Sequence, residues 1–167
     1  MRRLLAVAAV AAVAGLAAGS ARASLTPVEE RWAKPLVTVW NQQNAALQLV
    51  IKAALAQDAL IAGTKANGRL TTILAVFVSC GPAIEKAGQP PSPRLKRFHA
   101  ALSSACTHDT AGAHDFAQAV GAVRKNKAKL AQSLVTKGAG EFKLGSAAVA
   151  KAYHSLIAIG GKSVFKA

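Results

Sequence analysis

Apolar residues recur at helical spacing from residue 26 to the end of the chain. The first stretch opens with Thr26-Pro27-Val28-Glu29, which combines a capping threonine, a proline at the first helical position and a glutamate placed for a capping box. The apolar positions that follow step by three, four or seven residues, which predicts one long helix ending near Gly63. They are Val28, Trp32, Leu36, Trp40, Leu47, Ile51 and Leu55. The polar residues 41–44 are expected to form a solvated face of this helix.

The same pattern predicts four more helices. The second covers about residues 70–87 and is bent at Gly81-Pro82, and a proline-rich connector over residues 88–93 follows it. A third helix runs to Cys106, and the polar stretch 107–113 separates it from a fourth, which ends at Gly138. A loop begins at Gly138-Ala139-Gly140, and the fifth helix stops at Gly160-Gly161. Because no stretch alternates as strands do, we expect an all-α fold, an up-and-down helical bundle of four to five helices.

The first 23 residues have the layout of a secretion signal. Arg2 and Arg3 precede an uncharged run over residues 4–19, and Ala21-Arg22-Ala23 offers the small-x-small pattern that a signal peptidase accepts. The run is shorter than the roughly 20 residues of a membrane span. We expect cleavage after Ala23 to leave residues 24–167 as a single helical-bundle domain that is secreted, periplasmic or in the cell envelope. An uncleaved N-terminal anchor helix is the alternative.

The two cysteines lie on the apolar stripes of consecutive predicted helices. An even number of cysteines in an exported protein favours a disulfide between Cys80 and Cys106. Straight antiparallel helices would offset the two by roughly 9 Å along the axis, whereas bridged Cα atoms lie at most about 7 Å apart. A disulfide therefore requires the Gly81-Pro82 bend or an asymmetric connector. Two free buried thiols are the alternative.

The chain is strongly basic, with 21 Lys+Arg against 7 Asp+Glu and a net charge of +14, and most of the excess lies in its second half. Such a field attracts anions. The candidate anion-binding residues are Arg94, Lys96, Arg97, Arg124, Lys125, Lys127 and Lys129. Helical stepping from Val120 and Val123 places Lys127 on the apolar stripe, where it either extends outward along a buried stem or lines a cleft for an anion. A merely solvated helix face is the alternative for the whole set.

Two His-Asp pairs, His108-Asp109 and His114-Asp115, are the weak candidates for metal ligands. A step of six residues rotates about 240° on a helix, so the pairs converge only if they lie in a loop. No serine stands in a GxSxG elbow. Gly160-Gly161-Lys162-Ser163 lacks the first glycine of a phosphate-binding loop, because that position is Leu156. We therefore assign no catalytic residue and expect no cofactor.

The overall layout resembles uncharacterised secreted bacterial all-helical proteins with two cysteines, whose function is unknown. The resemblance rests on Cys80, the Gly88-to-Pro93 connector and Ala105-Cys106, and it covers residues 70–106. It implies an exported helical protein, and the group has no agreed activity that could be transferred to this chain. The leading hypothesis is a secreted, non-enzymatic helical binding or structural protein. The alternatives are a basic polyanion-binding protein of the cell envelope, with anionic lipid, a wall polymer or nucleic acid as partner, and a bundle that binds a small ligand or metal.

Overall fold

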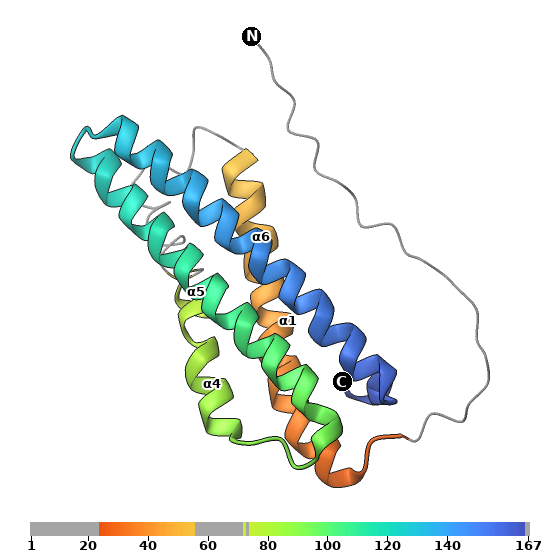
Figure 1. Ribbon diagram of the computed structural model, residues 1–167. Coiled ribbons are helices and arrows are strands. Elements are labelled where there is room, and N and C mark those ends of the chain that lie inside the picture. The colour runs from red at the N-terminus through yellow and green to blue at the C-terminus, as the bar shows by residue number, and fades with distance from the viewer. Residues whose placement is uncertain (1–23, 56–71, 73, 166–167) are drawn as a thin grey trace.

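The computed structural model describes residues 24–55, 72 and 74–165. For residues 50–55 it describes the backbone alone. Four helices run up, down, up and down along one another: α1 (Pro27–Leu55), α4 (Cys80–Ala87), α5 (Lys96–Arg124) and α6 (Ala128–Ala158) (Figure 1). Two short 3₁₀ helices, η1 (Pro93–Leu95) and η2 (Gly161–Phe165), precede α5 and follow α6. No strand occurs in these ranges, so the predicted all-α bundle is confirmed. The expectations for residues 1–23 and for the end of the first helix at Gly63 lie outside the described residues.

The long hairpin of α5 and α6 corrects the predicted boundaries in the second half of the chain. Two helices of 29 and 31 residues replace the three that the pattern indicated. The chain reverses at residues 125–127, inside the predicted fourth helix. There Asn126 takes a positive φ of 54°, and the Lys127 N–H donates to the Ala122 carbonyl at 2.9 Å. Asparagine tolerates this left-handed conformation, which ends helices in the way glycine does.

Both predicted interruptions are helical in the structure. Gly138 is buried in α6, and a Cβ there would lie 2.6 Å from Cδ2 of Phe116 on α5 and 3.0 Å from the Gly112 carbonyl oxygen. The glycines let the two helices approach closely and do not stop either of them. The polar stretch 107–113 continues α5, where the Thr107 hydroxyl donates back to the Ser103 carbonyl at 3.1 Å.

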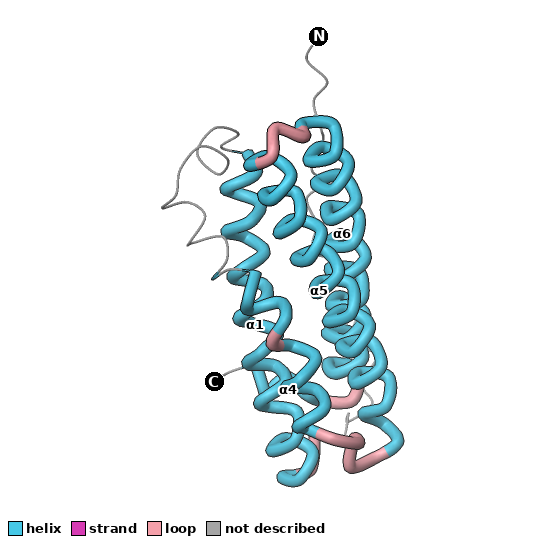
Figure 2. Tube along the Cα trace, turned by 90° about the vertical axis from the view of Figure 1, so that its left-hand side faces the viewer, coloured by secondary structure: helices cyan, strands magenta, loops and turns pink. Residues whose placement is uncertain are grey.

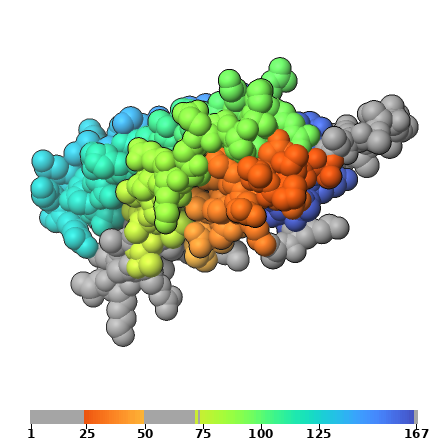
Figure 3. Space-filling model, turned by 90° about the horizontal axis from the view of Figure 1, so that it is seen from below, coloured from red at the N-terminus to blue at the C-terminus, as the bar shows by residue number. Residues whose placement is uncertain are grey.

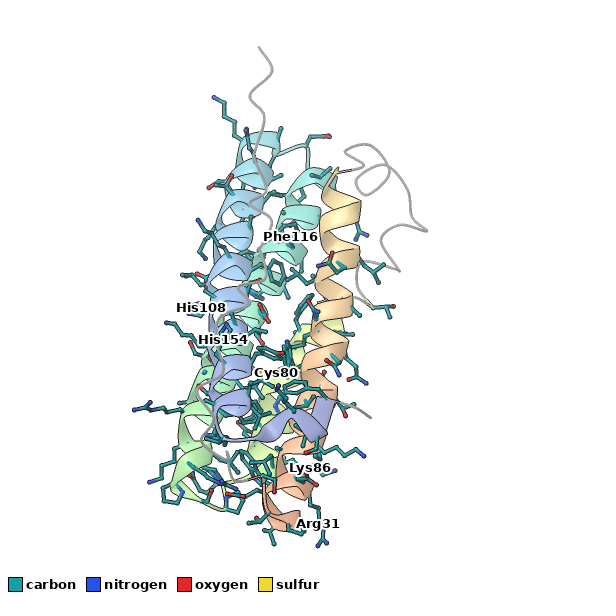
Figure 4. The ribbon with its side chains drawn as sticks, turned by 90° about the vertical axis from the view of Figure 1, so that its right-hand side faces the viewer. Arg31, Cys80, Lys86, His108, Phe116 and His154 are labelled. Carbon is teal, nitrogen blue, oxygen red and sulfur yellow. A yellow bond between two sulfur atoms is a disulfide. The ribbon has the colours of Figure 1, made fainter. Side chains whose placement is uncertain are left out.

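The interior consists of two apolar clusters at successive levels of the bundle. The disulfide cluster includes Leu36, Val37, Cys80, Phe98, Leu102, Cys106, Ala152 and Leu156. The tip cluster, nearer the α5–α6 turn, contains Ala46, Leu74, Phe77, Ala113 and Phe142, with Phe116 partly buried against them. Figure 4 shows Cys80 and Phe116 at these two levels. Between the rings of Phe77 and Phe142 the centroid distance is 4.9 Å.

Three connections fasten the level of the disulfide cluster. Cys80 and Cys106 form a disulfide with their Cα atoms 5.5 Å apart, so the predicted pairing is present. Figure 2 shows the break in the helical path just before α4, at Ser79, which makes α4 a short helix whose start lies beside α5. The Trp32 indole N–H donates to the Ala87 carbonyl at 2.8 Å, which ties α1 to the end of α4.

The third connection is a buried carboxylate at the start of α1. Glu29 accepts hydrogen bonds from the Thr26 N–H at 2.8 Å, from the Ser92 hydroxyl at 2.6 Å and from both Nε and Nη2 of Arg94. The Glu29 N–H donates in turn to the Thr26 hydroxyl at 3.3 Å, which completes the predicted capping box. Arg94, above all, holds the pKa of Glu29 well below its ordinary value, with further lowering by Ser92 and Thr26.

Candidate functional site

The turn between α5 and α6 carries four cations within six residues. Arg124, Lys125, Lys127 and Lys129 are all exposed, and none forms an ion pair with any residue that the structure describes. Leu130 lies directly beside them and is 48% exposed. We call these five residues the tip surface. From residue 116 to residue 140 the sequence has no acidic residue, so nothing in this segment offsets the positive charge.

Lys127 does not lie on an apolar stripe, contrary to the prediction. It is the residue before α6, in the turn, with its side chain exposed. The error follows from the helix boundary: stepping from Val123 at helical period assumes a continuous helix, and the helix ends at Arg124. The consequence is that Lys127 adds its charge to the tip surface.

The structure divides the predicted set of anion-binding residues into two groups. Lys96 and Arg97 lie in the first turn of α5, and Arg124 lies in its last turn. A helix of 29 residues is about 43 Å long at 1.5 Å per residue. Figure 3 shows the turn region (teal) at one end of the elongated molecule and the starts of α1 (orange) and α5 (green) toward the other. The two groups therefore form separate surfaces.

Arg94 is withdrawn from the anion-binding set by its contact with Glu29. The guanidinium donates two hydrogen bonds to this carboxylate and a third to the Ser24 carbonyl at 3.0 Å. Its positive charge is therefore already compensated within the protein, and its Nε and Nη2 donors are engaged. The role of Arg94 is to join the start of α1 to the turn before α5.

The two His-Asp pairs do not converge on a metal site. His108 bonds through Nδ1 to Oε2 of Glu141 on α6 at 2.8 Å, whereas His114 is exposed beside Gln118. Asp115 is buried and accepts a hydrogen bond from Nζ of Lys137 at 3.0 Å. Among the described residues no group of three His, Cys, Asp or Glu side chains could hold a metal ion. The pairs separate because they lie in helix and not in the loop that convergence required.

Asp109 behaves differently from the other members of these pairs. It is 4% exposed, and its Oδ1 has no hydrogen-bond partner within the described ranges. A Cβ added to Gly145 on α6 would lie 2.0 Å from this oxygen, so the carboxyl group rests directly against the backbone of α6. Burial raises the pKa of Asp109 to about 7, against an opposing effect of the neighbouring His108.

A second unpartnered polar side chain, Gln43, comes from α1. It is 2% exposed, and neither Oε1 nor Nε2 has a partner in the part of the chain that is described. The sequence pattern placed Gln43 with the solvated residues 41–44, and the structure contradicts this for Gln43 alone, since its neighbours are exposed. The available signal was spacing: Gln43 lies three residues after Trp40 and three before the buried Ala46.

Asp109 and Gln43 share one level of the bundle. On α5, Asp109 lies between Cys106 of the disulfide cluster and Ala113 of the tip cluster. On α1, Gln43 lies between Trp40, which packs on the disulfide cluster, and Ala46 of the tip cluster.

Gly145 occupies the same level on α6. It lies between Phe142 of the tip cluster and Ala152 of the disulfide cluster. We call the level of Gln43, Asp109 and Gly145 the waist. It is a polar layer between two apolar ones, and it combines a buried carboxyl group with a buried amide.

None of the described helices is long and apolar enough to cross a membrane.

Comparison with known proteins gives no relative from which a function could be transferred. No family model, no curated protein and no solved structure matches this chain.

Proposed function

We propose that this protein is an exported binding protein that docks on anionic lipid surfaces through its tip surface. The observation that carries the proposal is the grouping of four exposed, unpaired cations with the exposed Leu130 at one end of the bundle. Cations near an anionic membrane contribute about 1 kcal/mol each, and an adjacent apolar side chain can enter the boundary between headgroups and acyl chains.

Lipid is favoured over nucleic acid by the composition of the tip. No aromatic residue lies between Phe116 and Phe142 in the sequence, so the turn offers no ring on which a base could stack. Leu130 has an apolar side chain, which would gain little from a phosphate backbone and more from an acyl layer. Export is supported by the signal-like residues 1–23 and by the disulfide, which suits an oxidising compartment.

The test is co-sedimentation with vesicles of phosphatidylcholine, with and without phosphatidylglycerol. We expect binding only to the vesicles that contain phosphatidylglycerol, and a steep loss of binding as salt rises above about 0.1 M, where the Debye length is about 10 Å. Changing Arg124, Lys125, Lys127 and Lys129 together to Gln should weaken binding by roughly two to three orders of magnitude, because each cation contributes about 1 kcal/mol. Leu130→Ser should weaken the part of the binding that survives at high salt.

The matched control removes the same charge from the other end of the molecule. Lys34, Lys86, Lys96 and Arg97 are exposed and lie at the start of α1, the end of α4 and the start of α5. Changing these four to Gln should leave vesicle binding nearly unchanged. Equal losses in both variants would reduce the effect to net charge and overturn the assignment to the tip. Preferential, tip-dependent binding of a DNA duplex over the vesicles would replace lipid by nucleic acid as the partner.

A further inference from the structure

The waist presents a buried carboxyl group that has no cationic partner among the residues that the structure describes. On α1, residues 40–49 include no charged side chain, and Gln43 is the polar group that this helix buries there. Among the described residues 72 and 74–80, the segment before and at the start of α4 also has no charged residue. An ionised carboxylate in such surroundings is costly, since burial removes its hydration and nothing replaces it.

The charged groups of α5 and α6 around Asp109 are either bonded to other side chains or exposed to solvent. On α5, His108 bonds to Glu141 of α6, and Asp115 bonds to Lys137. The remaining cations of α6 in this region, Lys143 and Lys151, are exposed. A proton is therefore the simplest partner that can neutralise Asp109 without moving a helix.

We propose that Asp109 is a proton-dependent latch: its neutral form lets the three helices pack at the waist, and its ionised form loosens the half of the bundle that holds the tip cluster. The proposal does not depend on the lipid-binding function. A neutral carboxyl carries no charge that must be hydrated and can donate a hydrogen bond, whereas an ionised one needs water at the waist.

The raised pKa of Asp109, about 7, places this change near neutral pH. The folded protein holds the proton more tightly than the unfolded chain does, whose aspartates titrate near 3.8. The contribution of Asp109 to stability is therefore complete below about pH 4 and is lost as the pH rises through about 7. Acid tightens the waist, and alkali loosens it.

The loosening is confined to one half because the other half is fastened. The disulfide, the Glu29–Arg94 pair and the bond from Trp32 to Ala87 all lie at the level of the disulfide cluster. In the other half, the segment before α4 is held by one hydrogen bond, from the Thr110 hydroxyl to the Phe77 carbonyl at 3.2 Å, and the described part of α1 beyond Gln43 is held by the packing of Ala46 and Leu47. Local opening starts where such fastenings are fewest.

Hydrogen exchange with mass spectrometry tests the latch on the full-length, disulfide-bonded protein. Exchange is compared at about pH 5.5 and about pH 8, on either side of the pKa, after correction for the intrinsic chemistry of exchange. We expect peptides covering residues 43–49, 74–78 and 109–116 to open at least about tenfold more at the higher pH, the equivalent of about 1.4 kcal/mol. Peptides covering residues 28–36 and 150–157 should not respond.

Asp109→Asn is the decisive variant, because the amide keeps the shape of the carboxylic acid and cannot ionise. It should abolish the pH response and leave the protein in its protected state at both pH values. Asp115→Asn is the matched control, since Asp115 is buried on the same helix and already has Lys137 as a partner. That variant should keep the response.

A pH response that survives Asp109→Asn would overturn the proposal, as would its absence in the unaltered protein. If Asp109→Asn does not fold, the unaltered protein still decides the matter by NMR of labelled aspartate carboxyl carbons. The chain has three aspartates, Asp58, Asp109 and Asp115, and Asp115→Asn identifies one signal. A carboxyl titrating near 7 in step with the waist amides supports the latch. If all three titrate near the ordinary value of about 3.9, the latch is refuted.

Discussion

At the scale of single residues, two glycines of α6 have opposite requirements for space. Gly145 lies against the Asp109 carboxyl group, whereas a Cβ on Gly140 would meet nothing within 4 Å. We predict that Gly145→Ala destabilises the fold by about 1–3 kcal/mol through overpacking. Gly140→Ala should stabilise it by about 0.5–1 kcal/mol, because alanine loses less backbone entropy in a helix. Urea denaturation of both variants at one pH checks the pair, and equal effects would contradict the contact at Gly145.

A double substitution shows whether Asp109 is the group that excludes the side chain at position 145. In an Asp109→Ala background, the methyl group of Gly145→Ala gains room, since the carboxyl oxygen 2.0 Å from its position is gone. The cost of Gly145→Ala should then fall by at least about 0.5 kcal/mol, a coupling typical of residues in contact. Additive costs would mean that another part of α5 makes the contact.

At the scale of elements, the reversal between α5 and α6 depends on the conformation of Asn126. Its φ of 54° lies in a region that glycine adopts freely and a β-branched residue resists. Asn126→Gly should retain or slightly raise the unfolding free energy, and Asn126→Val should lower it by about 1–2 kcal/mol. Thermal unfolding of the two variants measures this. A tolerated valine would show that the turn is set by the packing of the helices and not by this residue.

The predicted and observed helices differ where a feature depends on a neighbouring helix. The fold class followed from helical periodicity, the capping box from the spacing of Thr26 and Glu29, and the disulfide partners from the even number of cysteines. The predicted helix end at Gly138 was wrong. This glycine is the point where α5 and α6 approach closely. Only the neighbouring helix distinguishes the two roles, so periodicity along one helix cannot.

The two candidate sites also differ in how much of each could be predicted from the sequence. The cations of the tip surface are evident in the sequence as a run of Lys and Arg without acids, and only their exposure and their distance from Lys96 and Arg97 required the structure. The waist was not predicted, since Gln43 and Asp109 are ordinary polar residues until three helices place them at one level between two apolar clusters.

At the scale of the whole molecule, two carboxyl groups define a window of pH in which the fold is most stable. Glu29 has a lowered pKa, so its contribution is present above the ordinary value of 4.5 and is lost as the pH falls. Asp109 has a raised pKa, so its contribution is lost as the pH rises through about 7. We predict a maximum in the unfolding free energy near about pH 4, where the gain from ionising Glu29 gives way to the loss from Asp109.

Urea midpoints measured across the pH range test this window one side at a time. Glu29→Gln should lower stability and flatten the acid side of the curve, because the loss on acidification comes from protonating Glu29. Asp109→Asn should flatten the decline between about pH 4 and pH 7. A curve whose two sides are unaffected by these variants would assign the pH dependence to other groups.

The dominance of the α5–α6 hairpin has a consequence for the order in which the chain assembles. These helices are adjacent in sequence and share the most extensive interface of the described elements, and contacts of low sequence separation form fastest. The hairpin is thus expected to form before α1 and α4 pack against it, while both thiols are still reduced. Pulsed hydrogen exchange on the reduced chain should show the amides of α5 and α6 becoming protected first. Oxidation then closes a loop across a separation of 26 residues, a constraint that stabilises by about 3–4 kcal/mol. The disulfide therefore stabilises a packing of helices that has already formed around the hairpin. Simultaneous protection of all four helices would refute this order of folding.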